Sequence, residues 1–461
     1  MKNSLFALND GSPKYKQIYK QFKSFIEQGN VKADEQLPSV RQLADSLQVS
    51  RNTTLMAYDQ LVAEGYIRGE GRKGYFVNQL EPHLYQETLT PRNNQRTKRE
   101  DTETVLIDFR TDTIDQSHFP LKIWRRMANQ VLALPESFRY GEPFGEICLR
   151  EQIAAYLFQS RGVKTNANAI MIGSSTQQML INLGHILKDN FSSVIVEDPG
   201  FDGAREAFQF HHFTLEYLPV SATGADLSHL KQMDSSLTYV TPSHHSPYGV
   251  SMSIQQRQTL IHWANKVQGY IIEDDYDSEF RYTQQPFPAL ASIDSTRVIY
   301  LGNFSKSFLP GLRLSYMVLP QPLLNRYKNR FLHFESSTSL FSQLTMAKFM
   351  VNGEWNRHIK RMRLVYKRKM EHLVSLLKEQ FGQNISIIGE QSGLYVLIKV
   401  NLACSEKWLM ERAHHYGVKV RPTSIYFIKN HPDRPIIKLG FSGLSFDEIE
   451  LGVNLLRKAW L

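Results

Sequence analysis

Short apolar runs alternate with longer amphipathic stretches from about residue 105 to the end of the 461-residue chain. The runs with the clearest strand character are Ile170–Ile172, Ser193–Val196, Leu237–Val240, Tyr270–Ile272 and Val298–Leu301. Buried strands separated by helical stretches are typical of a mostly parallel sheet whose strands are joined by crossover helices. The pattern therefore predicts an α/β domain over residues 105–461.

Two short helices joined by a tight turn are predicted near the start of the chain. The first begins after Ser39, which forms a capping-box pattern with Gln42 three residues later. Its apolar positions share one helical face: Val40, Leu43, Ala44 and Leu47. Ser50 caps the second helix, which runs from Arg51 to about Glu64. Three of its residues are expected to face inward: Leu55, Tyr58 and Val62.

A glycine-rich turn with two cations follows the second helix. Residues 66–68 and 75–77 have strand character, and the segment between them contains Arg72 and Lys73. A basic turn of this kind suits phosphates or a minor groove, and by itself it equally fits a solvent-facing hairpin. Because it follows a helix-turn-helix whose second helix starts with polar residues, we predict a winged helix-turn-helix over residues 1–78 that binds double-stranded operator DNA.

The expected DNA contacts lie at the two helix starts and in the wing. The candidates are Ser39, Arg41, Ser50, Arg51, Asn52, Thr53, Thr54, Arg68, Arg72 and Lys73. Bulk charge does not locate this contact, since residues 1–80 carry 11 Lys and Arg against 8 Asp and Glu, a net of +3 out of +9. Residues 79–104 are polar, charged and without periodicity, and they predict a flexible linker.

Composition indicates how the protein packs and in which compartment it is expected. A hydrophobic fraction of 42% and an aromatic fraction of 11% predict well-packed globular domains. The two cysteines, Cys148 and Cys404, are far apart in sequence, which suits a reducing compartment. We find neither a leader peptide nor an apolar run of bilayer-spanning length, so we expect a cytoplasmic protein with no membrane partner.

The α/β part contains candidates for every group that pyridoxal 5′-phosphate requires. Lys306, after the strand 298–301, supplies an amine for a Schiff base. A carboxylate of the cluster 273–277, at the end of another strand, can hold the pyridine nitrogen. Phe201 follows a third strand and can lie flat on the ring. The expected phosphate ligands are Ser175, Thr176, Ser305 and Arg313.

Each signal has a plainer interpretation. A Ser-Lys pair is usually a surface pair, and residues 173–178 could simply cap a helix. The acidic cluster 273–277 could be a solvated strand end or a metal site, but no histidine spacing supports a metal, and we predict none. The adjacent histidine pairs are interpreted as incidental: His211-His212, His244-His245 and His414-His415. The conjunction of all the groups, each after a strand, favours the cofactor.

Both parts of the chain resemble a known family. Residues 37–41, 49–53 and 64–66 match the GntR type of winged helix-turn-helix, and the strings 271–280 and 304–313 match class I aminotransferases. The combination resembles the MocR group of GntR regulators over nearly the whole chain. The resemblance implies a fold-type I aminotransferase-like domain in which Asp274 binds the pyridine nitrogen, Tyr276 lies nearby and Asp275 faces away. It also implies a homodimer that is domain-swapped, with the N-terminal domain packed against the partner's large domain.

One departure from the family concerns the carboxylate-binding arginine that many amino-acid-processing relatives carry near the C-terminus. Here that stretch is Gly440–Gly443, and Lys438 stands where many aminotransferases have arginine. A lysine makes a point contact instead of a bidentate one. Arg205 and Arg421 are candidates to replace the missing arginine.

Three functions remain open from the sequence. In the preferred hypothesis, the chain is a transcriptional regulator in which an amino compound displaces Lys306 and forms an external aldimine. In the second, pyridoxal phosphate itself is the signal, as in the vitamin B6-sensing members of the group. In the third, the chain is an aminotransferase that carries a DNA-binding appendage.

Overall fold

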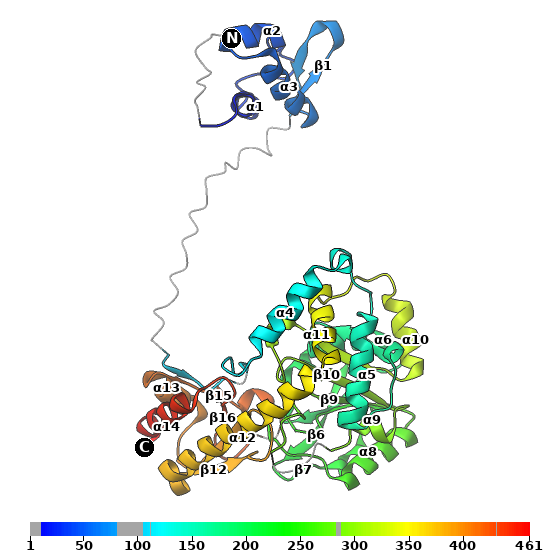
Figure 1. The fold of residues 1–461 in the computed structure, drawn as a ribbon, viewed down its shortest axis with the longest axis vertical. Helices are drawn as coiled ribbons and strands as arrows, with labels where there is room; N and C mark the ends of the chain where they lie inside the picture. The colour runs from blue at the N-terminus through cyan, green and yellow to red at the C-terminus, as the bar shows by residue number, and fades with distance from the viewer. Residues whose placement is uncertain (1–10, 81–104, 111, 283–286, 430) are drawn as a thin grey trace. The chain divides into compact units, whose positions relative to one another are not determined.

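The computed structural model describes residues 11–80, 105–110, 112–282, 287–429 and 431–461. The chain divides into two compact units, residues 1–101 and 102–461, and each is described by itself (Figure 1). Most of the predicted linker, residues 81–104, lies outside the described residues. No helix within the described ranges is long and apolar enough to cross a membrane.

The N-terminal unit contains three helices and a two-stranded antiparallel sheet. Its elements are α1 (Lys14–Glu27), α2 (Val40–Leu47), α3 (Arg51–Ala63), β1 (Ile67–Gly69) and β2 (Tyr75–Val77). The capping box forms as predicted, because the Ser39 side chain accepts from the Gln42 backbone and the Gln42 side chain accepts from the Ser39 backbone. The helix-turn-helix and the hairpin predicted from the sequence are thus confirmed.

The buried face of α3 differs from the prediction. The residues that it buries are Thr54, Ala57, Tyr58 and Leu61. Leu55 and Val62 are instead 39% and 40% exposed, so the expectation that they face inward is wrong. Tyr58 sets the rotation of the helix, because its hydroxyl donates to the Pro38 carbonyl at 2.9 Å and its ring packs edge-on against Phe22. The outward position expected for Thr54 is also wrong, since Thr54 is fully buried.

The C-terminal unit is built on an eight-stranded sheet of order β4-β11-β10-β9-β8-β5-β6-β7. Its strands are β4 (Ile170–Gly173), β5 (Ser193–Asp198), β6 (Thr214–Ser221), β7 (Gly224–Ala225), β8 (Leu237–Val240), β9 (Tyr270–Asp275), β10 (Val298–Asn303) and β11 (Ser315–Val318). All five predicted strands are present. The neighbours from β6 to β10 pair in parallel, whereas β11 inserts antiparallel between β4 and β10, so the sheet is mixed.

A second, smaller sheet has the order β12-β13-β16-β15. Its strands are β12 (Ile385–Ile388), β13 (Tyr395–Val400), β15 (Arg421–Pro422) and β16 (Ile436–Gly440). A separate parallel pair joins β3 (Ile107–Asp108) to β14 (Val418–Lys419). The longest helix, α12 (Glu354–Phe381), contacts α11 (Leu340–Val351) at one end and the small sheet at the other (Figure 1).

The remaining helices pack around these two sheets (Figure 1). They are α4 (Leu121–Leu132), α5 (Ile147–Arg161), α6 (Thr176–Leu187), α7 (Asp202–Phe210), α8 (Ile254–Lys266), α9 (Leu290–Ile293), α10 (Gln321–Phe331), α13 (Glu406–His415) and α14 (Phe446–Trp460). Helices α13 and α14 contact each other and β14, on the side of the small sheet.

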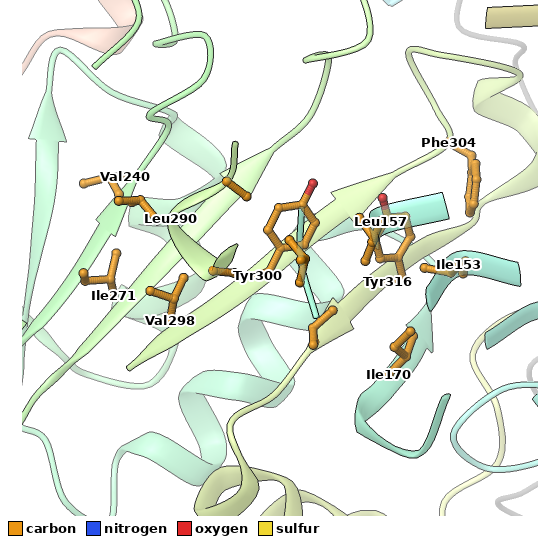
Figure 2. Packing of buried hydrophobic residues seen from close by; sticks show 14 of the residues in the cluster. Ile153, Leu157, Ile170, Val240, Ile271, Leu290, Val298, Tyr300, Phe304 and Tyr316 are labelled. Carbon is orange, nitrogen blue, oxygen red and sulfur yellow. The ribbon is translucent and has the colours of Figure 1, made fainter. Parts of the chain in front are cut away.

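The core under the large sheet fixes the segment that carries Lys306. Figure 2 shows side chains of neighbouring strands, such as Ile271, Val298 and Tyr300, packed together in one buried cluster. Phe304, just after β10, belongs to the same cluster, and its ring lies 5.2 Å from that of Trp355. Phe308 lies 4.9 Å from Phe349. These two buried rings hold the segment at both sides of Lys306.

Candidate functional site

A cavity of about 310 Å³ lies at the carboxyl ends of the large sheet's parallel strands. It is lined by Ser175, Thr176, Gln177, Phe201, Thr241, Ser246, Asp274, Tyr276, Asp277, Asn303, Ser305, Lys306, Arg313, Ser315, Leu394, Tyr395, Tyr426 and Lys438. The structure thus brings together all eight residues that the sequence predicted around the cofactor. Strand ends of a parallel sheet converge on one edge, which explains why residues distant in sequence meet here.

Lys306 lies between the two buried phenylalanines of its segment and is half-buried at the cavity wall. Burial lowers the pKa of its amine, and the positive charge of Arg421 lowers it further. Asp277 and Asp112 act in the opposite direction and favour the ammonium form. A lysine whose charged form is destabilised is a better nucleophile towards an aldehyde than an exposed lysine.

Asp274 has the geometry of a carboxylate that waits for a cationic donor. Its Oδ2 accepts from the Tyr239 hydroxyl at 2.5 Å, whereas its Oδ1 is buried and has no hydrogen-bond partner among the described residues. Burial raises the pKa of Asp274 to about 7, against the lowering effect of the Tyr239 hydrogen bond. A protonated pyridine nitrogen would supply the missing donor and restore the charged form.

Asp275, the next residue along β9, faces the other way, as the family resemblance implied. Its Oδ2 accepts from Arg161 at 2.7 Å and from the Tyr300 hydroxyl at 2.6 Å. Both residues of the Arg161–Asp275 ion pair are almost completely buried. Asp275 is therefore part of the fold's interior, while Asp274 belongs to the cavity.

Two of the predicted phosphate ligands, Ser175 and Thr176, lie at the start of helix α6. Ser175 caps this helix by accepting from the Gln178 backbone, and Thr176 is the first helical residue. Backbone N–H groups at a helix N-terminus, together with hydroxyls, form a favourable environment for a phosphate. Ser305 and Arg313 line the same cavity, and Arg313 remains exposed in this chain.

The three candidate effector ligands differ in their placement. Lys438 lines the cavity, with Nζ at 3.8 Å from the centroid of the Tyr395 ring and at 5.1 Å from that of Tyr426. Burial and the nearby charge of Lys306 lower the pKa of Lys438 to about 7. Arg421 is half-buried, does not line the cavity and lies 3.9 Å from Asp112.

Arg205 was expected to be able to bind the effector, but its guanidinium is used inside the fold. Its guanidinium donates to the carbonyls of Gly200 and Tyr426 at 2.9 and 3.0 Å, and to that of Ile425 at 2.7 Å. It does not line the cavity. Because its donors serve the backbone, Arg205 ties helix α7 to the loop before the small sheet's last strand.

The packing around Gly443 matches the absence of the carboxylate-binding arginine. A Cβ atom at Gly443 would lie 2.2 Å from the Thr113 Oγ1, so a side chain does not fit there without rearrangement. The neighbouring Ser442 is fully buried and donates to the Thr113 carbonyl at 2.7 Å. The departure from the family sequence is therefore built into the packing.

Several residues around the cavity were not predicted from the sequence, and four of them bear on its chemistry. Asp277, Tyr395 and Tyr426 line it, and His244 lies behind Asp277 at hydrogen-bond distance. The pair His244-His245 lacks the spacing of metal ligands, but both residues are 3% exposed and lie within hydrogen-bond distance of Asp277 and the Pro199 carbonyl, respectively. Burial lowers the pKa of His245 to about 3, and its ring nitrogen lies 3.1 Å from the Pro199 carbonyl. The excess of carboxylates at the end of β9 was the available signal for Asp277.

The predicted DNA contacts of the N-terminal unit are mostly exposed. Ser39, Arg41, Ser50, Arg51, Asn52, Arg72 and Lys73 are exposed, and Thr53 is half-buried. Arg68 is bound within the unit, since its guanidinium pairs with Asp34 at 2.7 Å and with Glu70 at 3.2 Å. Among the predicted contacts, the accessible cations are therefore Arg41 on α2, Arg51 in the first turn of α3, and Arg72 and Lys73 in the wing.

Comparison with known proteins identifies both units. Residues 14–77 match the model for bacterial regulatory proteins of the gntR family, and residues 107–450 match that for aminotransferases of class I and II. The chain is 30% identical over 468 residues to the probable rhizopine catabolism regulatory protein MocR of Rhizobium meliloti, covering 97% of this chain and 94% of that protein. The chain belongs to the MocR group of GntR-type regulators.

Two other HTH-type transcriptional regulators match over nearly the same length. The uncharacterized HTH-type transcriptional regulator YdeL of Bacillus subtilis (strain 168) is 39% identical over 451 residues, which cover 97% of each chain. The HTH-type pyridoxine biosynthesis transcriptional regulator PdxR of Corynebacterium glutamicum is 28% identical, covering 95% of this chain and 96% of that protein.

The large unit has the fold of a fold-type I aminotransferase. The structure of kynurenine aminotransferase from Pyrococcus horikoshii superposes with a TM-score of 0.69 at 24% identity, covering 77% of this chain and 91% of that chain. Enzymes of aminotransferase class I and II use pyridoxal phosphate, and this cofactor belongs to the large unit of the MocR-type chain. The unpartnered Asp274 Oδ1 beside Lys306 fits it.

Proposed function

We propose that this MocR-type regulator senses a small amino compound through Lys306 and the bound pyridoxal phosphate. The observation that carries the proposal is a single cavity with Lys306 at one wall and the unpartnered, buried Asp274 Oδ1 at another, in a chain that also has a DNA-binding unit. When bound, pyridoxal phosphate supplies an aldehyde carbon that exchanges reversibly between amines.

The proposed roles of the cavity residues follow from their chemistry. Asp274 holds the pyridine nitrogen in its protonated form, and Phe201 covers one face of the ring. Tyr276 provides a hydroxyl beside Lys306. The proposed phosphate ligands are Ser175, Thr176, Ser305 and Arg313. Each role uses a group that already faces the cavity, so binding requires little rearrangement.

Lys438 is the proposed ligand for an anionic end of the effector. It is the lysine of the small sheet that faces the cavity, and its two tyrosine neighbours hold it in place. Replacement by methionine is expected to weaken an acidic amine about tenfold or more, because a charge-assisted hydrogen bond is lost. The concentration of amine that shifts the visible absorbance by half measures this. Lys438→Arg keeps the charge and should retain most of the affinity; equal loss in both variants would contradict the role.

The assembly proposed for the chain is a homodimer with two DNA readers. Fold-type I relatives are typically dimers, and two readers per dimer fit an operator of paired half-sites. Residues 1–78 form the DNA-binding domain, 79–104 the linker and 105–461 the effector domain. The swapped arrangement, in which each reader serves the partner's effector domain, follows from family resemblance and is tested by a crosslink between the units in heterodimers.

Arg51 is expected to contribute strongly to DNA binding, because it is exposed at the first turn of α3. Arg51→Ala should lower affinity for a selected operator about 10- to 100-fold and reduce the slope of log affinity against log salt by about 0.9. Fluorescence anisotropy at several salt concentrations measures both. Arg68→Ala is the matched control, since Arg68 is already paired with Asp34 and Glu70. A larger effect at Arg68 than at Arg51 would overturn the assignment of α3 as the reading helix.

The experiment that tests the proposed function combines spectra with DNA binding. The purified holoprotein is screened against primary amines, and each amine that shifts the visible band is tested for its effect on operator affinity and bending. An effector must change one of these, because a ligand shifts an equilibrium only through a difference in its affinity for the two states. If every amine that shifts the band leaves DNA affinity and bending unchanged, the sensor hypothesis fails.

A second candidate is that pyridoxal phosphate itself is the signal. Two observations favour it. The packing around Gly443 leaves no room for a carboxylate-binding arginine, and the chain is similar to PdxR. Comparison of apoprotein and holoprotein on one operator tests it, and equal affinities exclude it. Steady turnover with an amino donor and a keto-acid acceptor would instead support the third possibility, an aminotransferase.

A further inference from the structure

A buried histidine–carboxylate pair adjoins the cavity and has no part in the cofactor roles above. Both His244 and Asp277 are 3% exposed, and the His244 Nδ1 lies 2.8 Å from each Asp277 carboxylate oxygen. Asp277 lines the cavity together with Lys306. A buried carboxylate at a ligand site is costly unless its charge is used, so this pair calls for a function.

The packing around His244 fixes the orientation of the pair. The ring of His244 lies 5.7 Å from that of Tyr276 and 5.4 Å from that of Tyr395, with small interplanar angles of 35° and 36°. On another side, a Cβ atom at Gly393 would lie 2.0 Å from the His244 Cε1, and Gly393 has a φ of +80°. The imidazole is therefore held in place and can orient Asp277. One N–H shared between two oxygens leaves the carboxylate with further acceptor capacity.

The charged groups around Lys306 differ in how strongly they act on its protonation. Asp277 and Asp112 favour its ammonium form, while burial and Arg421 oppose it. Asp112 is 54% exposed and lies near Arg110 and Arg421, so solvent and these cations screen it. Asp277 is buried, and its charge also favours the ammonium form of Lys438. The other cavity groups, Asp274 and Arg313, have roles assigned at opposite ends of the cofactor.

We propose that Asp277, oriented by His244, is the counter-ion that partly offsets the burial of Lys306 and favours its ammonium form whenever Lys306 is not joined to the cofactor. The inference rests on the proposed Schiff-base role of Lys306. The proton resides on Nζ, and the negative charge of Asp277 opposes its loss. Two opposite consequences follow. The counter-ion slows attachment of the cofactor near neutral pH, and it stabilises the state in which an amine has taken the place of Lys306.

The second consequence follows from conservation of charge. When an amine replaces Lys306, an ammonium ion of the effector is consumed and an ammonium ion of Lys306 is produced, with no net change in protons. The exchange is therefore favoured in proportion to how well the protein holds the Lys306 ammonium ion. Asp277 is a positioning residue in this account, since it acts through Lys306 and not on the reacting carbon.

The first test measures cofactor attachment to the full-length apoprotein as a function of pH. The rate, followed by the visible absorbance that develops after mixing with pyridoxal phosphate, rises with the fraction of neutral Lys306. In Asp277→Asn the midpoint of this rise should shift down by about one to three pH units. Attachment near pH 7 should accordingly become about tenfold faster or more. A merely structural role for Asp277 predicts slower attachment, so the direction of the change separates the two explanations.

Two further variants control the experiment. Asp112→Asn removes the exposed carboxylate that also faces Lys306, and its midpoint should move by less than about 0.5 unit. His244→Phe keeps the charge of Asp277 but removes the donor that orients it, so its midpoint should move less than that of Asp277→Asn. An unchanged midpoint in Asp277→Asn, or an equal shift in Asp112→Asn, overturns the proposal. Should Asp277→Asn fail to fold, Asp277→Glu retains the charge, and a midpoint that falls by a full unit in it would likewise overturn the proposal.

The second test uses methylamine as a simple probe of the holoprotein. The concentration that shifts the visible band by half should rise about tenfold or more in Asp277→Asn at pH 7, although the cofactor attaches faster. Opposite changes in these two measurements support the counter-ion, and changes in the same direction contradict it. Failure here is distinct from failure of the proposed function, because the latter would show as a missing Lys306-dependent band in the unmodified chain.

Discussion

Replacement of Lys306 by alanine is expected to remove the visible absorbance band of the protein-bound cofactor and every response to amines. Lys306 lines the cavity beside Asp274 on a segment anchored by two buried rings, so alanine should leave the fold intact. Without the amine, no Schiff base to the chain forms. Absorbance spectroscopy and mass spectrometry after borohydride reduction measure the loss, which should be complete.

Lys438 provides the control for this prediction, because it is a second amine in the same cavity. Lys438→Met retains Lys306 and should keep the covalent adduct after reduction. The reduced adduct should map to the peptide that contains Lys306. A persistent adduct in Lys306→Ala, mapped to Lys438, would move the Schiff base to the small sheet and contradict the assignment.

The second large effect is expected at Asp274. In Asp274→Asn the side chain keeps its shape but loses the charge that a protonated pyridine nitrogen requires. Since a hydrogen bond to a charged group contributes about 1.5–3 kcal/mol, the affinity for pyridoxal phosphate should fall about 10- to 150-fold. Titration of the apoprotein with the cofactor, followed by protein fluorescence, measures the dissociation constant.

Asp275→Asn is the matched control, one residue along the same strand. Its carboxylate binds the buried Arg161, so loss of the charge should destabilise the fold by about 3–5 kcal/mol and lower the melting temperature. Cofactor affinity at a temperature where the variant is folded should stay near that of the unmodified chain. A larger loss of cofactor affinity in Asp275→Asn than in Asp274→Asn would show that the two roles are exchanged.

Much of the cofactor site could be predicted from the sequence because its groups follow strands of one sheet. Phe201, Asp274 and Lys306 each come soon after an apolar run, and a parallel arrangement brings such positions to a common edge. The antiparallel β11 was not foreseen, since its four residues resemble any short apolar run. It still contributes to the site, because its first residue, Ser315, lines the cavity although β11 lies beyond β10 in the sheet.

Residues that enter the cavity from elsewhere could not be predicted in the same way. Tyr395 and Lys438 belong to the small sheet, and Tyr276 and Tyr395 are 119 positions apart although their hydroxyls lie 3.4 Å from each other. His244 lies in a segment of bends and turns. The alternation of side chains between two faces, which holds for an extended strand, therefore did not apply to it. Arg205 has a suitable charge and position in sequence, but its guanidinium donates hydrogen bonds to three backbone carbonyls instead.

The α3 prediction failed for a subtler reason. Positions 54, 57, 58 and 61 and positions 55, 58 and 62 both have helical spacing, and Tyr58 belongs to both sets. Hydrophobicity favoured the set with leucine and valine, whereas the structure buries the set with threonine and alanine. Small side chains there allow α3 to approach α1 and α2 closely, and that requirement is tertiary.

The parallel pair of β3 and β14 has a mechanical consequence. Ile107 and Asp108 are among the first described residues after position 104, and they are hydrogen-bonded in register to Val418 and Lys419, three residues before the end of β15 in the small sheet. Lys438, the proposed contact of the effector, lies on the neighbouring strand β16 and pairs with Arg421. The start of the described part of the C-terminal unit is thus attached beside the small sheet that carries the proposed effector contact. A tilt of this sheet against the eight-stranded one would therefore displace Ile107 and Asp108 together with Val418 and Lys419.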